Sequence, residues 1–455
     1  METFETFERT LPQEKAPTPP ARLFRFRSSP RAAKDLPPWS PGKRLLFRFT
    51  FSYLALYILP FPLIYIPYVA VAAGWYQKLW RLLVPWVGKQ VFHVDITVFP
   101  NGSGDTTFNY VQLVCHLAIA TAATLLWTLL DRRRTQYIRL FAWLRTFVRF
   151  SLASAMIGYG AAKVIQSQFP APTLSRLLQP FGDASPMGLL WTFMGASRSY
   201  NFFGGAAEML GGLLLTLRRT TLLGALVTIA VMANVVMLNF SYDVPVKLYS
   251  LHLLAMAAFL VVPDLRRLAG MFLFNREVAP AVDRPLFTGR WLHHGTRALR
   301  TLLVLAFVWL SIQETYEGLK LYGELAPKPP LYGIWNVDEI TVAGTARPPL
   351  VTDLDRWRRV AFDYPGMASI QLMNDSRRRY TVAIDTKKRT LQLAKRDDPK
   401  TKYPFSYQQT GPETLLLQGT FEGQPVVARL HRMKESSYPL LNRGFHWINE
   451  YPFNR

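Results

Sequence analysis

Three ionisable side chains lie within long apolar stretches of this chain, where their chemistry is most unusual. Glu208 lies in the middle of residues 199–217. Lys163 lies near the end of residues 143–165, and His252 lies in a third apolar stretch. A membrane interior solvates charge poorly, so an ionisable residue in such a segment is a functional candidate. We expect Glu208 to exchange a proton or a hydrogen bond with a ligand, and Lys163 and His252 to orient that ligand.

Each of these residues also has a structural interpretation. If Arg145 marks the inner interface, Lys163 lies roughly 27 Å beyond it at 1.5 Å per residue, near the outer interface. A lysine there can extend its ammonium group to the lipid headgroups. The alternative is an ion pair of Lys163 with Asp243 or Glu208. A lone histidine on an apolar helix is more often a hydrogen-bonded structural residue than a ligand-binding one.

Four more polar residues fall at the same end of the apolar stretches as Lys163. We expect them to contact a ligand in a polar pocket that opens to the outer leaflet or the periplasm; they are Asp105, Arg198, Asp243 and Lys247. The loop that contains Asp105 is also compatible with a plain turn before the next helix.

Several enzyme classes are excluded by their missing motifs. The sequence has no Gly-x-Ser-x-Gly elbow, phosphate-binding loop, dinucleotide fingerprint or His-Glu-x-x-His pair. His293 and His294 have no further ligands nearby in the sequence, so no metal site is expected. Cys115 is the single cysteine, which excludes an intrachain disulfide. Redox chemistry would therefore need a bound cofactor or a partner.

Long apolar segments must position these side chains. The chain of 455 residues is 50% hydrophobic and only 18% charged, and it contains seven stretches of membrane-spanning length. These stretches are 49–74, 109–130, 143–165, 199–217, 220–242, 247–263 and 297–316. The first contains Pro60, Pro62 and Pro67, so we expect a kinked or broken helix there. Residues 48–320 are therefore predicted to form a helical membrane domain.

The formal net charge of +23 reflects Lys and Arg residues beside the apolar segments, and this pattern indicates contact with the lipid bilayer rather than with nucleic acid. Ten of them precede residue 49, and others follow the second, fourth and sixth stretches. By the positive-inside rule, residues 1–47 form a disordered basic tail in the cytoplasm of a bacterium. Seven spans across the inner membrane would place the C-terminal domain in the periplasm, whereas six would place it in the cytoplasm.

Residues 331–455 have the alternating pattern of a separate all-β domain. Eight strand-like runs are joined by tight turns, which is typical of an antiparallel barrel. The runs lie near 333–342, 357–363, 368–374, 378–385, 389–396, 403–409, 414–421 and 424–432. Gly333-Ile334-Trp335 resembles the Gly-x-Trp element that opens lipocalins. Trp335 is expected either to plug the barrel floor or to contact a small ligand.

Two glycine-rich motifs in the helical domain carry a second resemblance. Gly158-Tyr159-Gly160-Ala161-Ala162-Lys163 ends one stretch, and Gly204-Gly205-Ala206-Ala207-Glu208-Met209-Leu210-Gly211-Gly212 fills another. With the closing Pro263-Asp264, they resemble the DoxX-like membrane family over about residues 138–270. The resemblance implies a four-helix bundle, and some members of that family accompany quinone-linked oxidoreductases.

The functional hypothesis follows from this resemblance and from the polar residues. We expect a quinone or a similar isoprenoid lipid in the outer-leaflet pocket, in a subunit that works with periplasmic or membrane redox proteins. The alternative is a non-enzymatic scaffold or lipid-handling protein whose barrel docks a partner or a small ligand. In that case Glu208 and Lys163 would only lock helices together.

Overall fold

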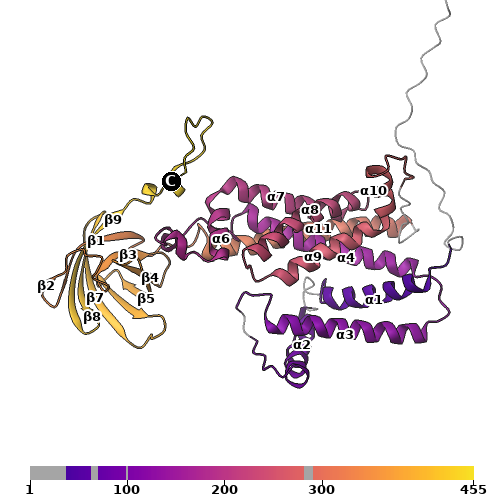
Figure 1. Cartoon of the computed structure of the whole chain (residues 1–455), viewed down its shortest axis with the longest axis horizontal. Helices are drawn as coiled ribbons and strands as arrows, with labels where there is room; N and C mark the ends of the chain where they lie inside the picture. Colours follow the sequence, from indigo (N-terminus) through magenta and orange to yellow (C-terminus); the bar gives the residue numbers. More distant parts are fainter. Residues whose placement is uncertain (1–36, 63–69, 99–100, 281–289, 455) are drawn as a thin grey trace, which may run out of the picture.

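The computed structural model describes residues 37–62, 70–98, 101–280 and 290–454. A helical domain is followed by a C-terminal β-barrel at one end of the molecule (Figure 1). This arrangement confirms the predicted combination of a membrane-type helical bundle with a C-terminal antiparallel barrel.

Eight longer helices build most of the helical domain: α1 (Pro41–Ile58), α2 (Ala70–Val91), α3 (Thr107–Leu130), α4 (Ile138–Val164), α7 (Arg198–Thr216), α8 (Thr221–Ser241), α9 (Lys247–Val261) and α11 (Arg290–Tyr322). Shorter helices connect them, including α5 (Leu174–Leu177), α6 (Pro186–Ala196) and α10 (Leu265–Phe272). Among the described residues, five segments are long and apolar enough to cross a membrane: Thr107–Leu130, Ile138–Val164, Thr221–Ser241, Lys247–Phe272 and His294–Leu321.

The two remaining predicted spans differ from this set. The stretch 49–74 is not one helix, because α1 ends at Ile58 and is followed by Pro60 and Pro62, which cannot donate backbone hydrogen bonds. The predicted break is therefore confirmed; Pro67 lies outside the described residues. The stretch 199–217 does form α7, but its glycines and polar residues leave it less apolar than the other five.

Helix α1 also begins earlier than expected. Ser40 accepts a hydrogen bond from the backbone amide of Lys43 (3.3 Å), and Pro41 occupies the first helical position, so residues 41–47 are helical. The predicted disordered tail was wrong for these residues, because a Ser-Pro helix start and the buried Phe47 outweigh the basic composition.

Glycines bring α7 against its two neighbours. A Cβ atom on Gly205 would lie 2.6 Å from the carbonyl oxygen of Gly160 on α4, and one on Gly211 would lie 2.7 Å from Thr228 on α8. A Cβ on Gly204 would meet nothing within 4 Å. The close approach to α4 is therefore made by Gly205 and not by its neighbour Gly204.

The barrel has nine strands: β1 (Gly333–Val342), β2 (Thr345–Ala346), β3 (Trp357–Phe362), β4 (Met367–Leu372), β5 (Arg377–Asp385), β6 (Thr390–Lys395), β7 (Lys402–Gly411), β8 (Thr414–Phe421) and β9 (Gln424–Met433). Neighbours pair antiparallel, and β1 also pairs with β9, so eight strands close the barrel while the short β2 lies beside β1. Its centre is filled by large side chains, among them Trp357, Phe362, Tyr403 and Phe405.

The barrel is attached to the helical domain by more than its linker. The carboxylate of Asp363, just after β3, accepts hydrogen bonds from the backbone amides of Leu174 (3.1 Å) and Ser175 (2.9 Å) at the start of α5. Leu174 and Ile334 lie in one small apolar cluster there. Since α5 belongs to the connection between α4 and α6, the barrel contacts the end of the bundle at which α4 finishes (Figure 1).

Candidate functional site

A buried ion pair joins α4 to α7. The Lys163 ammonium lies 2.8 Å from the Glu208 carboxylate, and the two side chains are only 9% and 4% exposed. Lys163 also lies over the rings of Tyr159 (5.6 Å) and Phe169 (5.8 Å). This geometry confirms the pairing of Lys163 with Glu208, which was one of the two predicted partners, and excludes snorkelling. The close contact between Gly160 and Gly205 lets the two helices approach near this pair.

A cavity of about 180 Å³ lies beside the ion pair. Lys163 and Glu208 supply its charged groups, and Asn239 of α8 adds an amide. The Asn239 side-chain nitrogen is buried and has no hydrogen-bond partner among the described residues. The other walls are mainly apolar and come largely from α6, α8 and α9; they include Met187, Leu190, Trp191, Met194, Val235 and Leu238. Such a cavity suits a mainly apolar ligand with a few polar atoms.

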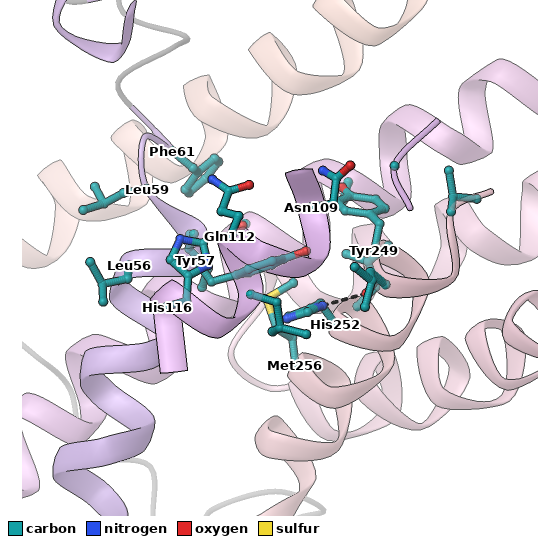
Figure 2. A pocket seen from close by; sticks show the side chains of 18 of the residues that line it. Leu56, Tyr57, Leu59, Phe61, Asn109, Gln112, His116, Tyr249, His252 and Met256 are labelled. Atoms are coloured by element: carbon teal, nitrogen blue, oxygen red, sulfur yellow. Dashed lines mark hydrogen bonds between the residues drawn. The ribbon is translucent and has the colours of Figure 1, made fainter. Parts of the chain in front are cut away.

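A larger cavity of about 700 Å³ lies next to the first, and Tyr159 and Tyr249 line both. His252 lines the larger cavity and not the smaller one (Figure 2). Its Nδ1 lies 2.6 Å from the carbonyl oxygen of Leu248, which can only accept, so Nδ1 carries the hydrogen. Its Nε2 lies 2.5 Å from the Tyr53 hydroxyl, and its ring stacks on Tyr57 at 3.9 Å. The structure therefore does not group His252 with Glu208 and Lys163.

The predicted polar residues at the start of α9 position the helix. Asp105 accepts hydrogen bonds from the backbone amides of Lys247 (2.7 Å) and Leu248 (2.9 Å), so it caps α9 from the loop before α3. The Lys247 ammonium pairs with Asp243 at 2.8 Å, and the Asp243 side chain is 86% exposed. Neither cavity is lined by Asp105, Asp243 or Lys247. Their side chains instead make contacts at the start of α9 and in the turn before it.

Arg198 and Trp335 also lie away from the two cavities. Arg198 pairs with Glu324 at 2.5 Å, and both side chains are exposed, so it links α7 to the end of α11. Trp335 is 1% exposed within the barrel core, and its Nε1 donates to the carbonyl oxygen of Leu331 at 2.9 Å. This placement favours the predicted barrel plug over a ligand contact.

Three residues of α3 that line the larger cavity were missed by the sequence reasoning. Asn109, Gln112 and His116 are spaced i, i+3 and i+7, which places them on one helix face. A polar stripe on an otherwise apolar helix is a signal that the sequence contained. Charge alone does not distinguish the two amides, because Asn109 and Gln112 are neutral.

Comparison with known proteins gives a family but no activity. Over 126 residues the chain is 34% identical to the uncharacterised protein YwoB of Bacillus subtilis (strain 168); the match covers 27% of this chain and 79% of YwoB. No protein-family model and no solved structure matches the chain. The likeness to DoxX-like proteins therefore stays a prediction. Because the match spans most of YwoB, this chain belongs to the same family as YwoB.

Proposed function

We propose that this membrane protein binds a quinone or a similar isoprenoid lipid and serves as a membrane component of a redox system. The observation that carries the proposal is the Lys163–Glu208 ion pair in the wall of a mainly apolar cavity. Reduction of a quinone adds two electrons and two protons to its ring oxygens. A neighbouring ammonium can donate a hydrogen bond to a ring oxygen, a carboxylate can accept one from a quinol hydroxyl, and both groups can exchange protons with the ring oxygens. The electrons would come from a partner redox protein, since this chain has a single cysteine.

The size of the smaller cavity supports a ring-sized head. A cavity of about 150 Å³ in another protein holds benzene, and the volume here is about 180 Å³. Asn239 adds a third polar group, whose unpaired nitrogen would donate a hydrogen bond to a ring oxygen. The isoprenoid tail would leave the cavity between its apolar wall residues. Lys163 and Glu208 are the residues proposed to contact the ring.

We place the protein in a bacterial inner membrane, with its N-terminus in the cytoplasm and its lipocalin-like barrel in the periplasm. The support is the distribution of Lys and Arg along the chain. The contact of the barrel with α5 adds to it, because that contact lies at the end of the bundle opposite the arginine-rich turns 131–134 and 218–219. Fusing a reporter to the C-terminus tests this topology; an active cytoplasmic reporter would contradict it.

The binding proposal is tested with the purified full chain and decylubiquinone as the probe. We expect saturable binding, and a loss of about tenfold or more in affinity when Lys163 and Glu208 are both replaced by Met, since hydrogen bonds to charged groups contribute about 1.5–3 kcal/mol. Mass spectrometry of small molecules that remain with the wild-type protein gives an independent readout. Absence of binding together with no co-purified quinone or lipid would refute the proposal.

The competing function is a scaffold in which the ion pair only holds α4 against α7. The close glycine packing of these helices favours that alternative. The single variants Lys163→Met and Glu208→Met separate the two: unchanged decylubiquinone binding with a lowered melting temperature would favour the scaffold. Arg198→Met removes an exposed ion pair on α7 and is the matched control.

A further inference from the structure

The larger cavity has the size and position of a second ligand site. Its volume of about 700 Å³ lies within the range of about 300–1,000 Å³ that is usual for small-molecule sites. It extends along α9 from Val246 to Met256, which is about 15 Å at 1.5 Å per residue. The helices α3, α4 and α9, which line it, are all long and apolar enough to cross a membrane. A ligand of this cavity would therefore enter from the bilayer.

Two helices each direct a row of polar side chains toward this cavity. Asn109, Gln112 and His116 come from α3, and Tyr249 and His252 come from α9 (Figure 2). Both sets follow the spacing of one helix face. The Asn109 side-chain oxygen already accepts from Thr106, so Asn109 offers its amide nitrogen as a donor. The amide of Gln112 and the hydroxyl of Tyr249 add hydrogen-bonding groups without charge.

The two histidines differ in their free hydrogen-bonding capacity. Both ring nitrogens of His252 have partners, so its ring serves mainly as a stacking surface against Tyr57. His116 is 6% exposed, and its Nε2 has no hydrogen-bond partner among the described residues. A buried polar atom of this kind normally has a partner in the protein, in water or in a ligand. A hydroxyl group in the cavity would provide one.

The residues that line the cavity determine whether a charged ligand can bind there. No Lys, Arg, Asp or Glu is found among the described residues that line it. A phosphate or an ammonium group buried there would lose its hydration without a compensating charge. The wall formed by the end of α1 is mainly apolar and includes Leu56, Ile58, Leu59 and Phe61. The cavity therefore combines an uncharged polar side with an apolar side.

We propose that this cavity is a second binding site, separate from the ion-pair cavity, for an uncharged glycerolipid with a free hydroxyl group, such as a diacylglycerol. The amides of Asn109 and Gln112 bind the glycerol and ester oxygens, and His116 accepts the hydroxyl hydrogen. The acyl chains lie against the end of α1. The site discriminates against phosphorylated lipids through the missing positive charge.

Two probes with identical acyl chains test the proposal. Dioctanoylglycerol and dioctanoyl phosphatidate differ only by the phosphate, and each is titrated against the purified full chain by native mass spectrometry. We expect dioctanoylglycerol to bind at least tenfold more tightly. Gln112→Leu should weaken its binding by about tenfold, and Ala155→Phe, which fills the cavity, should abolish it. Thr121→Val removes a polar group from the exposed face of α3 and is the matched control.

A charge-introducing variant keeps the test decisive if Gln112→Leu or Ala155→Phe folds poorly. Gln112→Lys places an ammonium group in the cavity, so it should shift the preference toward phosphatidate by at least tenfold. Equal binding of both probes to the wild-type chain would overturn the proposal. So would dioctanoylglycerol binding that Ala155→Phe and Gln112→Lys leave unchanged.

Discussion

At the scale of single residues, burial makes each polar group in the helices dependent on its partner. Removing one member of a buried ion pair typically costs about 3–5 kcal/mol, whereas replacing both members by apolar residues is often neutral. Lys163 and Glu208 meet the conditions for this behaviour, because both are almost fully buried and 2.8 Å apart. Exposed pairs such as Arg198–Glu324 contribute only about 0–1 kcal/mol.

We therefore expect the single variants Lys163→Met and Glu208→Met to be clearly less stable than the wild type, each by about 3 kcal/mol. The double variant should recover most of that loss, because it leaves no unpaired ion. Thermal unfolding of the purified variants in one detergent measures this, with Arg198→Met expected to change little. A double variant no more stable than the worse single variant would contradict the coupling.

A second prediction at this scale concerns Tyr332 at the junction with the barrel. Burial raises the pKa of Tyr332 to about 12, with Glu435 and Asp363 adding to the effect. A raised pKa means that the folded state favours the protonated phenol, so this contribution is complete below pH 10 and is lost as the pH rises toward 12. Between pH 9 and pH 11 the melting temperature of Tyr332→Phe should fall less than that of the wild type. Equal falls would show that this phenol does not contribute.

The individual site residues were only partly predictable from the sequence. A mid-helix glutamate within a glycine-rich segment indicated burial, and charge complementarity limited the partners of Lys163 to two. Nothing local indicated that Tyr53 would meet His252, because these residues are 199 positions apart. The role of Asp105 as the cap of α9 could not be predicted for the same reason, since it depends on a contact between residues 142 positions apart.

At the scale of elements, the lengths of the apolar stretches predicted where most helices lie. Packing between helices determines which face of each helix is buried. Hydropathy placed α3, α8 and α9 to within about two residues, whereas α4 begins at Ile138 and α11 spans Arg290–Tyr322, so both extend beyond the predicted stretches. The prolines after Ile58 predicted the break beyond α1. The rotation of α7 about its axis was not predictable to one residue, because glycines lie on several of its faces. The strands were easier, since alternation and tight turns determine which side chains fill the barrel.

Neighbouring glycines on α7 provide a direct test of that rotation. Gly205→Ala should destabilise the protein by about 1–3 kcal/mol, because its methyl group would meet the backbone of α4. Gly204→Ala should be neutral or stabilising by up to about 1 kcal/mol, because it improves helix propensity in open space. Thermal unfolding of both variants in one detergent checks this; equal effects would place the α4 contact elsewhere.

At the scale of the whole molecule, the barrel is attached at two places. The chain enters it from α11, and the Asp363 carboxylate holds the start of α5. The side chain of Arg377 adds a hydrogen bond to the carbonyl oxygen of Ser175. The sequence predicted two domains and a linker. It did not predict the contact between the barrel and the four-residue helix α5, because that contact joins residues far apart in the chain.

The second attachment can be removed without touching the linker. In Asp363→Ala the backbone amides of Leu174 and Ser175 lose their acceptors, so they should exchange with deuterium at least tenfold faster. The amides of the barrel strands should keep their protection. Hydrogen–deuterium exchange followed by mass spectrometry measures both, with Asp397→Asn on an exposed loop as the control. Unchanged exchange at residues 174–175 would show that the contact with Asp363 does not protect them.

The pairing of β1 with β9 has a consequence for the order in which the barrel can form. Ile334 of β1 pairs with Met433 of β9, so β1 cannot complete its pairing until a strand 99 residues later in the chain has been synthesised. Contacts between such distant residues slow folding, and until closure both strands keep an open edge that can pair with another chain. A chain that stops before residue 424 would lack β9, so the edges of β1 and β8 would stay open permanently. Newly made protein is therefore most prone to self-association in the interval before its last strand arrives.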